Sequence, residues 1–279
     1  MTVKATLKRA ALAALFLPLL AAAPAPSAQI KLWRLDCGAI WVKDLDSGFS
    51  DTRAYVGQSR ELVASCYLIR HGETYMLWDT GFSRTELGKP LDHNAEGGAT
   101  LHVSLIDQLK QLGISPAQIS LIGISHYHGD HTGQASDFPA AKLMIGKGDV
   151  DAMKENPARA TALKHWMSEG GALDPVTGDK DVFGDGKVVM IDLPGHTAGH
   201  HGLMVHLEHK GWVILSGDAA HIRENYENNG VPPFNVDRAK SLASLDRFHK
   251  LAANLKATVV VQHEPRDVAK LPAFPEGAE

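Results

Sequence analysis

Apolar runs of four to nine residues recur along the chain from residue 30 onward and predict short strands. Apolar side chains spaced three or four residues apart predict helices at residues 103–112, 150–153, 158–167 and 239–255. Strands and helices that alternate in this way predict an α/β fold, with one domain over residues 29–279. The expected strands are residues 30–35, 62–70, 74–78, 119–124, 142–145, 188–193, 202–207, 212–215 and 258–261.

Four of these strands lead directly to a residue that can bind a metal ion. Residues 119–124 lead to His126, 188–193 to His196, 212–215 to Asp218 and 258–261 to His263. Because α/β proteins place their sites at the ends of strands, we expect these side chains to belong to one site.

The segment that begins at His126 is dense in metal-binding residues, since His128, Asp130 and His131 follow within it. Imidazole and carboxylate groups suit zinc and other first-row divalent ions. In an extended loop, alternate side chains project together and that of His131 turns to the other side, so one segment can serve two adjacent ions. Gly129 is expected where this loop folds closely. A solvated His-rich surface loop is the alternative interpretation, which the position at a strand end disfavours.

Residues 1–28 have the layout of a secretory signal peptide. Lys4, Lys8 and Arg9 form a basic start, residues 10–23 are apolar except for Pro18, and residues 24–28 are small. The apolar run is shorter than the roughly 20 residues needed to span a bilayer. We therefore expect cleavage after Ala28, a periplasmic or secreted protein, and no membrane association of the mature chain.

Composition adds two observations to this picture. The chain is 44% hydrophobic and 22% charged, as in ordinary globular proteins, and its net charge of −4 offers no basic surface for nucleic acid. Its two cysteines, Cys37 and Cys66, either form a disulfide in an oxidising compartment or remain free thiols, and the sequence favours neither.

Segment 126–131 resembles the HxHxDH motif of the metallo-β-lactamase superfamily. Asp79-Thr80-Gly81 looks like the DTG turn of that superfamily, and segment 195–200 is similar to its GHTxGH element. Asp218 and His263 match its bridging aspartate and its last ligand. The resemblance covers nearly all of the chain after residue 28 and implies a metallo-β-lactamase-like αββα sandwich.

This resemblance also implies a site for two divalent ions, expected to be Zn²⁺, with iron, manganese or cobalt as alternatives. A hydroxide that bridges the ions would be the nucleophile, because metal coordination lowers the pKa of water to about 7. Asp130 would accept or relay a proton, Asp79 would orient a ligand histidine, and His200 is expected not to bind metal. The implied ligands are His126, His128 and His196 for one ion, Asp130, His131 and His263 for the other, and Asp218 for both.

Within the superfamily, the chain most resembles the N-acyl homoserine lactone lactonases, through segments 35–38, 67–72, 217–219 and 223–227. The implied activity is the opening of a small lactone ring, as in quorum quenching. Many members carry a tyrosine three residues after the bridging aspartate, where this chain has His221. An imidazole also donates hydrogen bonds, so His221 is expected as a catalytic and substrate-binding residue, with a purely structural histidine as the alternative. Phe82 and Tyr226 are the other expected substrate contacts.

Other branches of the superfamily fit less well. Its β-lactamases typically have cysteine or serine in place of the bridging Asp218, and the 16 residues after His263 leave no room for the helical domain of glyoxalase II-type thioesterases. The retained alternatives are an organophosphate or aryl ester hydrolase, another ester or thioester hydrolase, and a non-catalytic metal-binding protein. The expected partners are a small-molecule lactone or ester and, as one option, a second copy of the chain in a homodimer.

Overall fold

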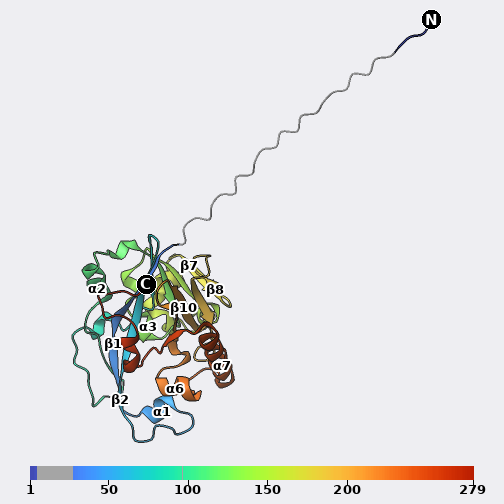
Figure 1. Ribbon diagram of the computed structural model, residues 1–279. Helices are drawn as coiled ribbons and strands as arrows, with labels where there is room; N and C mark the ends of the chain where they lie inside the picture. The colour runs from blue at the N-terminus through green and yellow to red at the C-terminus, as the bar shows by residue number, and fades with distance from the viewer. Residues whose placement is uncertain (5–27, 96) are drawn as a thin grey trace.

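The strands form two facing sheets, and helices cover the outer face of each sheet (Figure 1). This computed structural model describes residues 1–4, 28–95 and 97–279, so the predicted signal segment falls almost entirely outside the described residues. The predicted αββα sandwich is confirmed by this layering. Within the described residues, every helix is too short or too polar to cross a membrane.

The first sheet has seven strands in the order β4-β1-β2-β3-β5-β6-β7. Strands β4, β1, β2 and β3 pair antiparallel, whereas β3, β5, β6 and β7 pair in parallel. Parallel neighbours need crossover connections, usually helices, which cover the outer face of the sheet. The strands are β1 (Ile30–Val42), β2 (Arg60–His71), β3 (Thr74–Trp78), β4 (Gly98–Thr100), β5 (Ile119–Ile124), β6 (Lys142–Gly146) and β7 (Leu173–Val176).

The second sheet has five strands in the order β12-β11-β10-β9-β8 and is antiparallel except for the parallel pair β11–β12. The long helix α7 crosses between β11 and β12 in sequence and lies on the outer face of this sheet (Figure 1). The strands are β8 (Lys180–Asp181), β9 (Val188–Asp192), β10 (His201–Leu207), β11 (Gly211–Leu215) and β12 (Thr258–Val260). The α-helices are α1 (Leu45–Phe49), α2 (Leu105–Gln111), α3 (Gly129–Thr132), α4 (Lys147–Glu155), α5 (Lys164–Ser168), α6 (Arg223–Asn228) and α7 (Arg238–Leu255).

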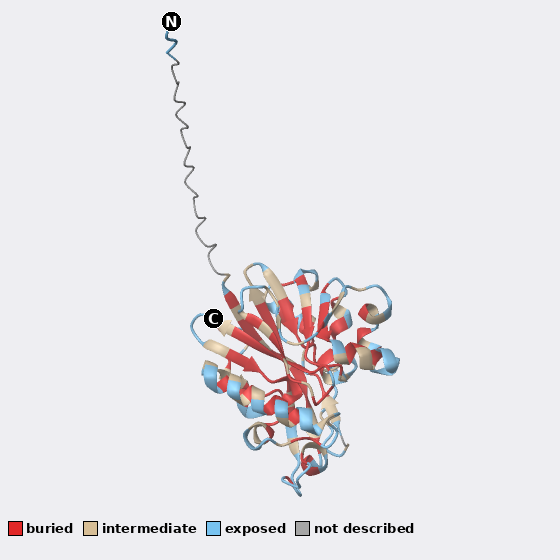
Figure 2. Ribbon diagram, turned by 90° about the vertical axis from the view of Figure 1, so that its right-hand side faces the viewer, coloured by how far each residue is buried: buried red, intermediate tan, exposed pale blue. Residues whose placement is uncertain are grey.

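The alternation of side chains along each strand builds a core on both faces of the first sheet. On β2, Tyr67 and Ile69 point into the core between the two sheets, whereas Cys66 and Leu68 point into the core beneath the outer helices. Both sets are buried, which is why β2 has a continuous apolar sequence instead of an alternating one. Figure 2 shows the buried strands in the middle of the molecule and the exposed helix faces around them.

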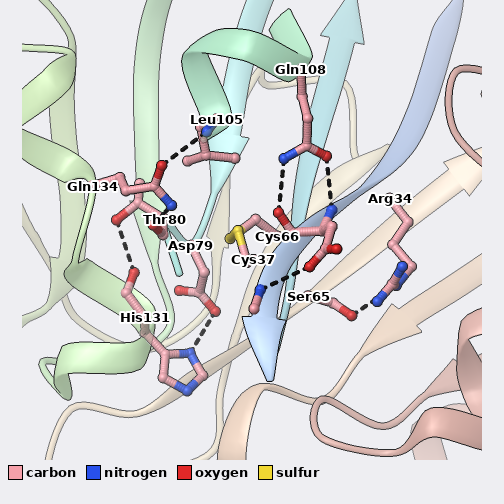
Figure 3. The surroundings of a disulfide bond; sticks show 12 residues. Arg34, Cys37, Ser65, Cys66, Asp79, Thr80, Leu105, Gln108, His131 and Gln134 are labelled. Carbon is pink, nitrogen blue, oxygen red and sulfur yellow. Dashed lines mark hydrogen bonds and ion pairs between the residues drawn. A yellow bond between two sulfur atoms is a disulfide. The ribbon is translucent and has the colours of Figure 1, made fainter. Parts of the chain in front are cut away.

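A disulfide joins Cys37 of β1 to Cys66 of β2, with 5.7 Å between the two Cα atoms (Figure 3). The sequence left this pairing open, and the structure decides it. The register of β1 against β2 shifts between Asp36 and Ala39, so the disulfide lies at a β-bulge. Gly38 within this bulge has a positive φ of 109°, a conformation that favours glycine.

Several predicted boundaries were wrong for local reasons. The strand predicted at residues 30–35 continues to Val42, because the bulge carries β1 past Gly38. The helix predicted at residues 158–167 is instead a 3-10 helix (Pro157–Leu163) followed by the short α5. Strands β7 and β8 were missed because they are short and contain Asp174, Pro175 and Asp181, which are rare in strands.

Candidate metal centre

The loop after β5 carries the first four candidate ligands. His126 follows the strand, His128 is the residue before α3, and Asp130 and His131 lie on the single turn of α3. The loop was predicted to be extended throughout, which is wrong for residues 129–131, because they lie in α3. This helical turn directs His131 away from His128. A Cβ atom on Gly129 would meet nothing within 4 Å, so the expected close packing there is also wrong.

Three histidines bring one ring nitrogen each to a common point. The Nε2 atom of His126 lies 2.9 Å from Nδ1 of His128 and 3.1 Å from Nε2 of His196, and the last two atoms are 3.0 Å apart. Zinc–nitrogen bonds of about 2.0–2.1 Å in a tetrahedral site place ligand nitrogens about 3.3 Å apart. This triangle of nitrogens therefore fits a divalent metal ion.

A second group consists of Asp130, His131 and His263. The Oδ2 atom of Asp130 lies 3.6 Å from Nε2 of His131 and 3.5 Å from Nε2 of His263. The sequence predicted these two groups as separate ligand sets, and the structure brings together the members of each.

Asp218 lies between the two groups and turns one carboxylate oxygen to each. Its Oδ2 atom is 3.6 Å from Nε2 of His126 and 3.5 Å from Nε2 of His196. Its Oδ1 atom is 3.4 Å from Nε2 of His131 and 3.1 Å from Nε2 of His263. If each group held a metal ion, Asp218 could be a ligand of both.

Two buried atoms of the centre test whether metal ions fit it. Among the described residues, Nε2 of His131 and Oδ1 of Asp218 are buried without a hydrogen-bond partner. Buried polar atoms are normally paired, because an unpaired one loses its hydration without compensation. Both atoms point into the candidate centre, and a bound cation would satisfy them. The ligand set therefore fits divalent metal ions.

Hydrogen bonds on the far side of the rings hold the ligand histidines in place. Nδ1 of His131 donates to Asp79 (2.9 Å), Nδ1 of His196 to Oδ1 of Asn235 (2.9 Å), and Nδ1 of His263 to the Val63 carbonyl (2.8 Å). Each bond places the proton on Nδ1 and leaves Nε2 free as a ligand. The orienting role expected of Asp79 agrees with its position, whereas Asn235 lacks a motif and was missed.

The charges of the centre differ between its two halves. Burial, together with the neighbouring imidazoles, lowers the pKa of His126 and of His196 well below the usual range, so both rings are neutral. Burial also opposes the protonation of His131, but the carboxylates of Asp218, Asp130 and Asp79 outweigh it and raise its pKa well above the usual range. The half that contains His131 thus attracts positive charge, as a cation site should.

His200 uses both ring nitrogens within the protein. Its Nδ1 donates to the Leu193 carbonyl (3.0 Å), and its Nε2 accepts a hydrogen bond from the backbone N–H of Asp218 (2.8 Å). Burial lowers the pKa of His200 to about 3, so the ring is neutral. It therefore has no free lone pair for a metal, and it positions the backbone of Asp218 instead.

A cavity of about 140 Å³ opens over the two groups of ligands. His221 lines it and is almost fully buried, with Nε2 3.1 Å from Oδ2 of Asp218. Within the described residues, neither ring nitrogen of His221 has a hydrogen-bond partner. The rings of Phe49 and Phe234 pack edge-on against His221 at centroid distances of 5.1 and 5.5 Å. The cavity thus has a polar floor and apolar walls.

Two expected substrate contacts lie elsewhere. The partly buried Phe82 packs against the core beneath the outer helices of the first sheet. Tyr226 packs against Phe248 and His249 of α7, because the turn of α6 directs its ring toward that helix. Neither residue lines the cavity above the ligands, so their positions do not support substrate contact. Phe49, at the end of α1, and the loop residue Phe234 occupy that place instead, and nothing in their sequence distinguishes them from ordinary structural residues.

Comparisons with known proteins concern the family and the fold of the chain. The family model of the metallo-beta-lactamase superfamily matches residues 59–263. The chain is 30% identical over 182 residues to the N-acyl homoserine lactonase AttM of Agrobacterium fabrum strain C58, which covers 61% of this chain and 68% of that protein. It is 27% identical to an N-acyl homoserine lactonase of a Bacillus species, over 83% of this chain and 93% of the relative. A crystal structure of a quorum-quenching N-acyl homoserine lactone lactonase matches with a TM-score of 0.75 and 25% identity, covering 90% of this chain and 99% of that one.

Proposed function

The chain belongs to the metallo-beta-lactamase superfamily, a family of metal-dependent hydrolases, and on that premise we propose that it opens the ring of N-acyl homoserine lactones with two bound metal ions. The observation that carries this proposal is the position of Asp218, whose two oxygens face the two ligand groups separately. A protein that only binds one metal needs no shared carboxylate. The similarity to lactonases over most of the chain supports the lactone as substrate.

Each ligand group would hold one metal ion, and Asp218 would be a ligand of both ions. When bound, such ions supply a nucleophile at neutral pH and polarise the scissile carbonyl. The ions are expected to be zinc, because imidazole and carboxylate ligands without thiolates suit it, although iron, manganese and cobalt accept the same ligands. The ligands are His126, His128 and His196 in one group and Asp130, His131 and His263 in the other.

Asp130 is the proposed proton acceptor. Its side chain is 24% exposed and lines the cavity, whereas the carboxylate of Asp218 is almost fully buried between the ligand groups. Asp130 is therefore the carboxylate that a substrate or water in the cavity can reach. It accepts the proton released as the nucleophile attacks, and it returns that proton to the alkoxide that leaves when the ring opens.

His221 is the proposed hydrogen-bond donor to the substrate. It lines the cavity, and its ring nitrogens have no partner among the described residues, so one N–H is available for a carbonyl or alkoxide oxygen. The rings of Phe49 and Phe234 also contact each other, 5.9 Å apart, and pack edge-on against neighbouring parts of the imidazole, which holds its orientation. We expect His221→Phe to lower kcat more than it raises KM while the metal content stays unchanged. An unchanged kcat would leave His221 with a structural role only.

The size of the cavity also bears on the substrate. Pockets for drug-sized ligands enclose about 300–1,000 Å³, and this cavity encloses about 140 Å³. A small ring fits inside it, and an acyl chain must extend out of it, past the half-exposed Phe234. This agrees with a substrate whose reactive part is a small lactone.

A substrate panel tests the proposed reaction. Metal-loaded protein should hydrolyse N-acyl homoserine lactones faster than a phosphotriester, an aryl ester or a β-lactam. Faster turnover of the phosphotriester or the aryl ester would show that the protein is an organophosphate or aryl ester hydrolase and not a lactonase. Tight metal binding without turnover of any of these substrates would reduce the protein to a metal binder.

Substitution of Asp130 tests the mechanism. We expect Asp130→Asn to keep part of the metal and to lower kcat by about 10²–10⁴-fold, the usual contribution of a general base. Asp246→Asn is the matched control, because Asp246 is exposed on α7 and, among the described residues, pairs only with Lys250. Unchanged turnover in the Asp130 variant would remove this residue from the mechanism.

We further propose that the protein is secreted or periplasmic and loses residues 1–28. The disulfide between Cys37 and Cys66 supports an oxidising compartment. Mass spectrometry of protein recovered from the periplasm or medium should give a chain that begins at Gln29. Recovery of the full-length chain from the cytosol alone would contradict this. A homodimer stays a prediction that light scattering can test.

A further inference from the structure

One fully buried carboxylate outside the ligand set connects two segments that carry ligand histidines. Asp149 lies on the first turn of α4, directly after β6, and is 0% exposed. Its Oδ2 atom accepts hydrogen bonds from the backbone N–H of Tyr127 (3.2 Å) and from the hydroxyl of Thr197 (2.9 Å). Its Oδ1 atom accepts from the backbone N–H of Gly199 (2.7 Å).

The donors of these bonds flank the histidines of one ligand group. Tyr127 stands between His126 and His128, and Thr197 directly follows His196. The ring nitrogens of the three histidines lie within 3.1 Å of one another, although His196 is 70 residues away from His126 in the sequence. Asp149 therefore accepts hydrogen bonds both from the loop that carries His126 and His128 and from the loop that carries His196.

Glycines bring the backbones of these segments into direct contact. A Cβ atom on Gly146 would lie 1.8 Å from the Gly199 carbonyl oxygen, and one on Gly148 would lie 2.6 Å from the Ala198 carbonyl. A Cβ on Gly199 would lie 2.4 Å from the backbone nitrogen of Asp149. The backbone around Asp149 therefore touches the backbone of residues 198–199 directly. A displacement of Asp149 would displace the loop that carries His196.

We infer that Asp149 is a positioning residue for the metal site of His126, His128 and His196. It holds the two loops at the separation that makes the nitrogens converge, and it does so without contacting the ligands. Burial raises the pKa of Asp149 to about 6, so near neutral pH the carboxylate is ionised and accepts all three bonds. This inference rests on the proposed two-metal function.

Replacement by asparagine tests the inference. An asparagine side chain has one acceptor oxygen and one donor nitrogen, so it cannot accept from donors that approach both carboxylate oxygens. We expect Asp149→Asn to weaken the binding of one ion per chain by about 10–100-fold, as loss of an orienting partner does elsewhere. The second ion, at Asp130, His131 and His263, should be retained.

The measurement is a competition titration of metal-free protein with Co²⁺ against a chelator, followed by the visible absorption of each Co²⁺ site. The matched control is Asp181→Asn, because that carboxylate, at the end of β8, also accepts three hydrogen bonds, here from the backbone N–H groups of a turn that does not line the cavity. Thr197→Val removes a single donor and should give a smaller selective loss, which Thr197→Ser should restore. This variant decides the question if Asp149→Asn does not fold.

The outcomes separate a positioning role from a structural one. Selective weakening of one ion supports the inference. Equal weakening of both ions, or wild-type binding of both in folded Asp149→Asn and Thr197→Val, overturns it while leaving the proposed function intact. Failure of the wild-type protein to bind a second ion would instead contradict the proposed function.

Discussion

The disulfide between Cys37 and Cys66 allows a prediction whose size follows from the chain itself. The two cysteines are 29 residues apart in the sequence. A cross-link that closes a loop of this length lowers the entropy of the unfolded chain enough to stabilise the folded state by about 3.6 kcal/mol at 25 °C. Folded domains are typically stable by about 5–15 kcal/mol, so this one bond supplies a large share of the stability.

Urea unfolding of metal-free protein, with and without a reductant, measures this contribution. Reduction keeps both buried sulfur atoms in the chain, so no core volume is lost. We expect the free energy of unfolding to fall by about 3.6 kcal/mol when reductant is present throughout the unfolding equilibrium. The Cys37→Ala/Cys66→Ala variant is the control and should not respond to reductant.

A loss below about 1 kcal/mol in the wild-type protein would refute this reasoning. It would mean that the unfolded chain already holds the two strands together, or that the folded state does not contain the bond. A response of the double alanine variant would show that the reductant acts elsewhere.

Three further predictions concern residues around the metal centre. His200→Phe leaves the Leu193 carbonyl and the Asp218 N–H unpaired, so urea unfolding should show a loss of about 2–6 kcal/mol; a loss below about 1 kcal/mol would contradict this. Asp79→Asn replaces a carboxylate that accepts hydrogen bonds from Nδ1 of His131 and from the backbone N–H of Ser125. Metal binding should weaken about 10–100-fold in chelator competition, and wild-type affinity would count against the orienting role of Asp79. The raised pKa of Asp149, about 6 against 3.8, means that the folded protein retains a proton that the unfolded chain loses first. The free energy of unfolding of metal-free wild type should therefore fall relative to Asp149→Asn by about 3 kcal/mol as pH rises from about 3 to about 7, and a pH-independent difference would rule this out.

The sequence predicted most of the candidate site because ligands follow strands and cluster in motifs. His126, His196, Asp218 and His263 each follow a buried strand, and apolar runs of this kind are easy to detect. The grouping of the ligands into two sets came from the resemblance to the superfamily, and the structure brings together the members of each set.

Residues that act only through contacts with distant segments could not be predicted in this way. Asn235 and Asp149 contact the ligand loops only because distant segments fold against each other. Asp149 follows β6 and two glycines, Gly146 and Gly148, and that signal resembles the other strand ends. The carboxylate was overlooked because no histidine and no recognisable motif accompany it in the sequence.

The placement of substrate-contacting side chains depended on loop conformation, which local sequence does not determine. Phe82 was predicted as a substrate contact because it follows the Asp79-Thr80-Gly81 turn. In the structure the backbone N–H of Phe82 donates to the Cys37 carbonyl, and its ring turns toward the core. The two phenylalanines that face the cavity come from α1 and from the loop before α7.

The proposed enzyme holds one metal ion in each ligand group, with Asp218 as a ligand of both ions, and hydrolyses a lactone. The most direct test of this proposal is a titration of metal-free protein with Zn²⁺ while the hydrolysis of an N-acyl homoserine lactone is followed. Activity should rise with added metal and reach its plateau at two equivalents per chain. A plateau at one equivalent, or no lactone hydrolysis at any ratio, would contradict the account.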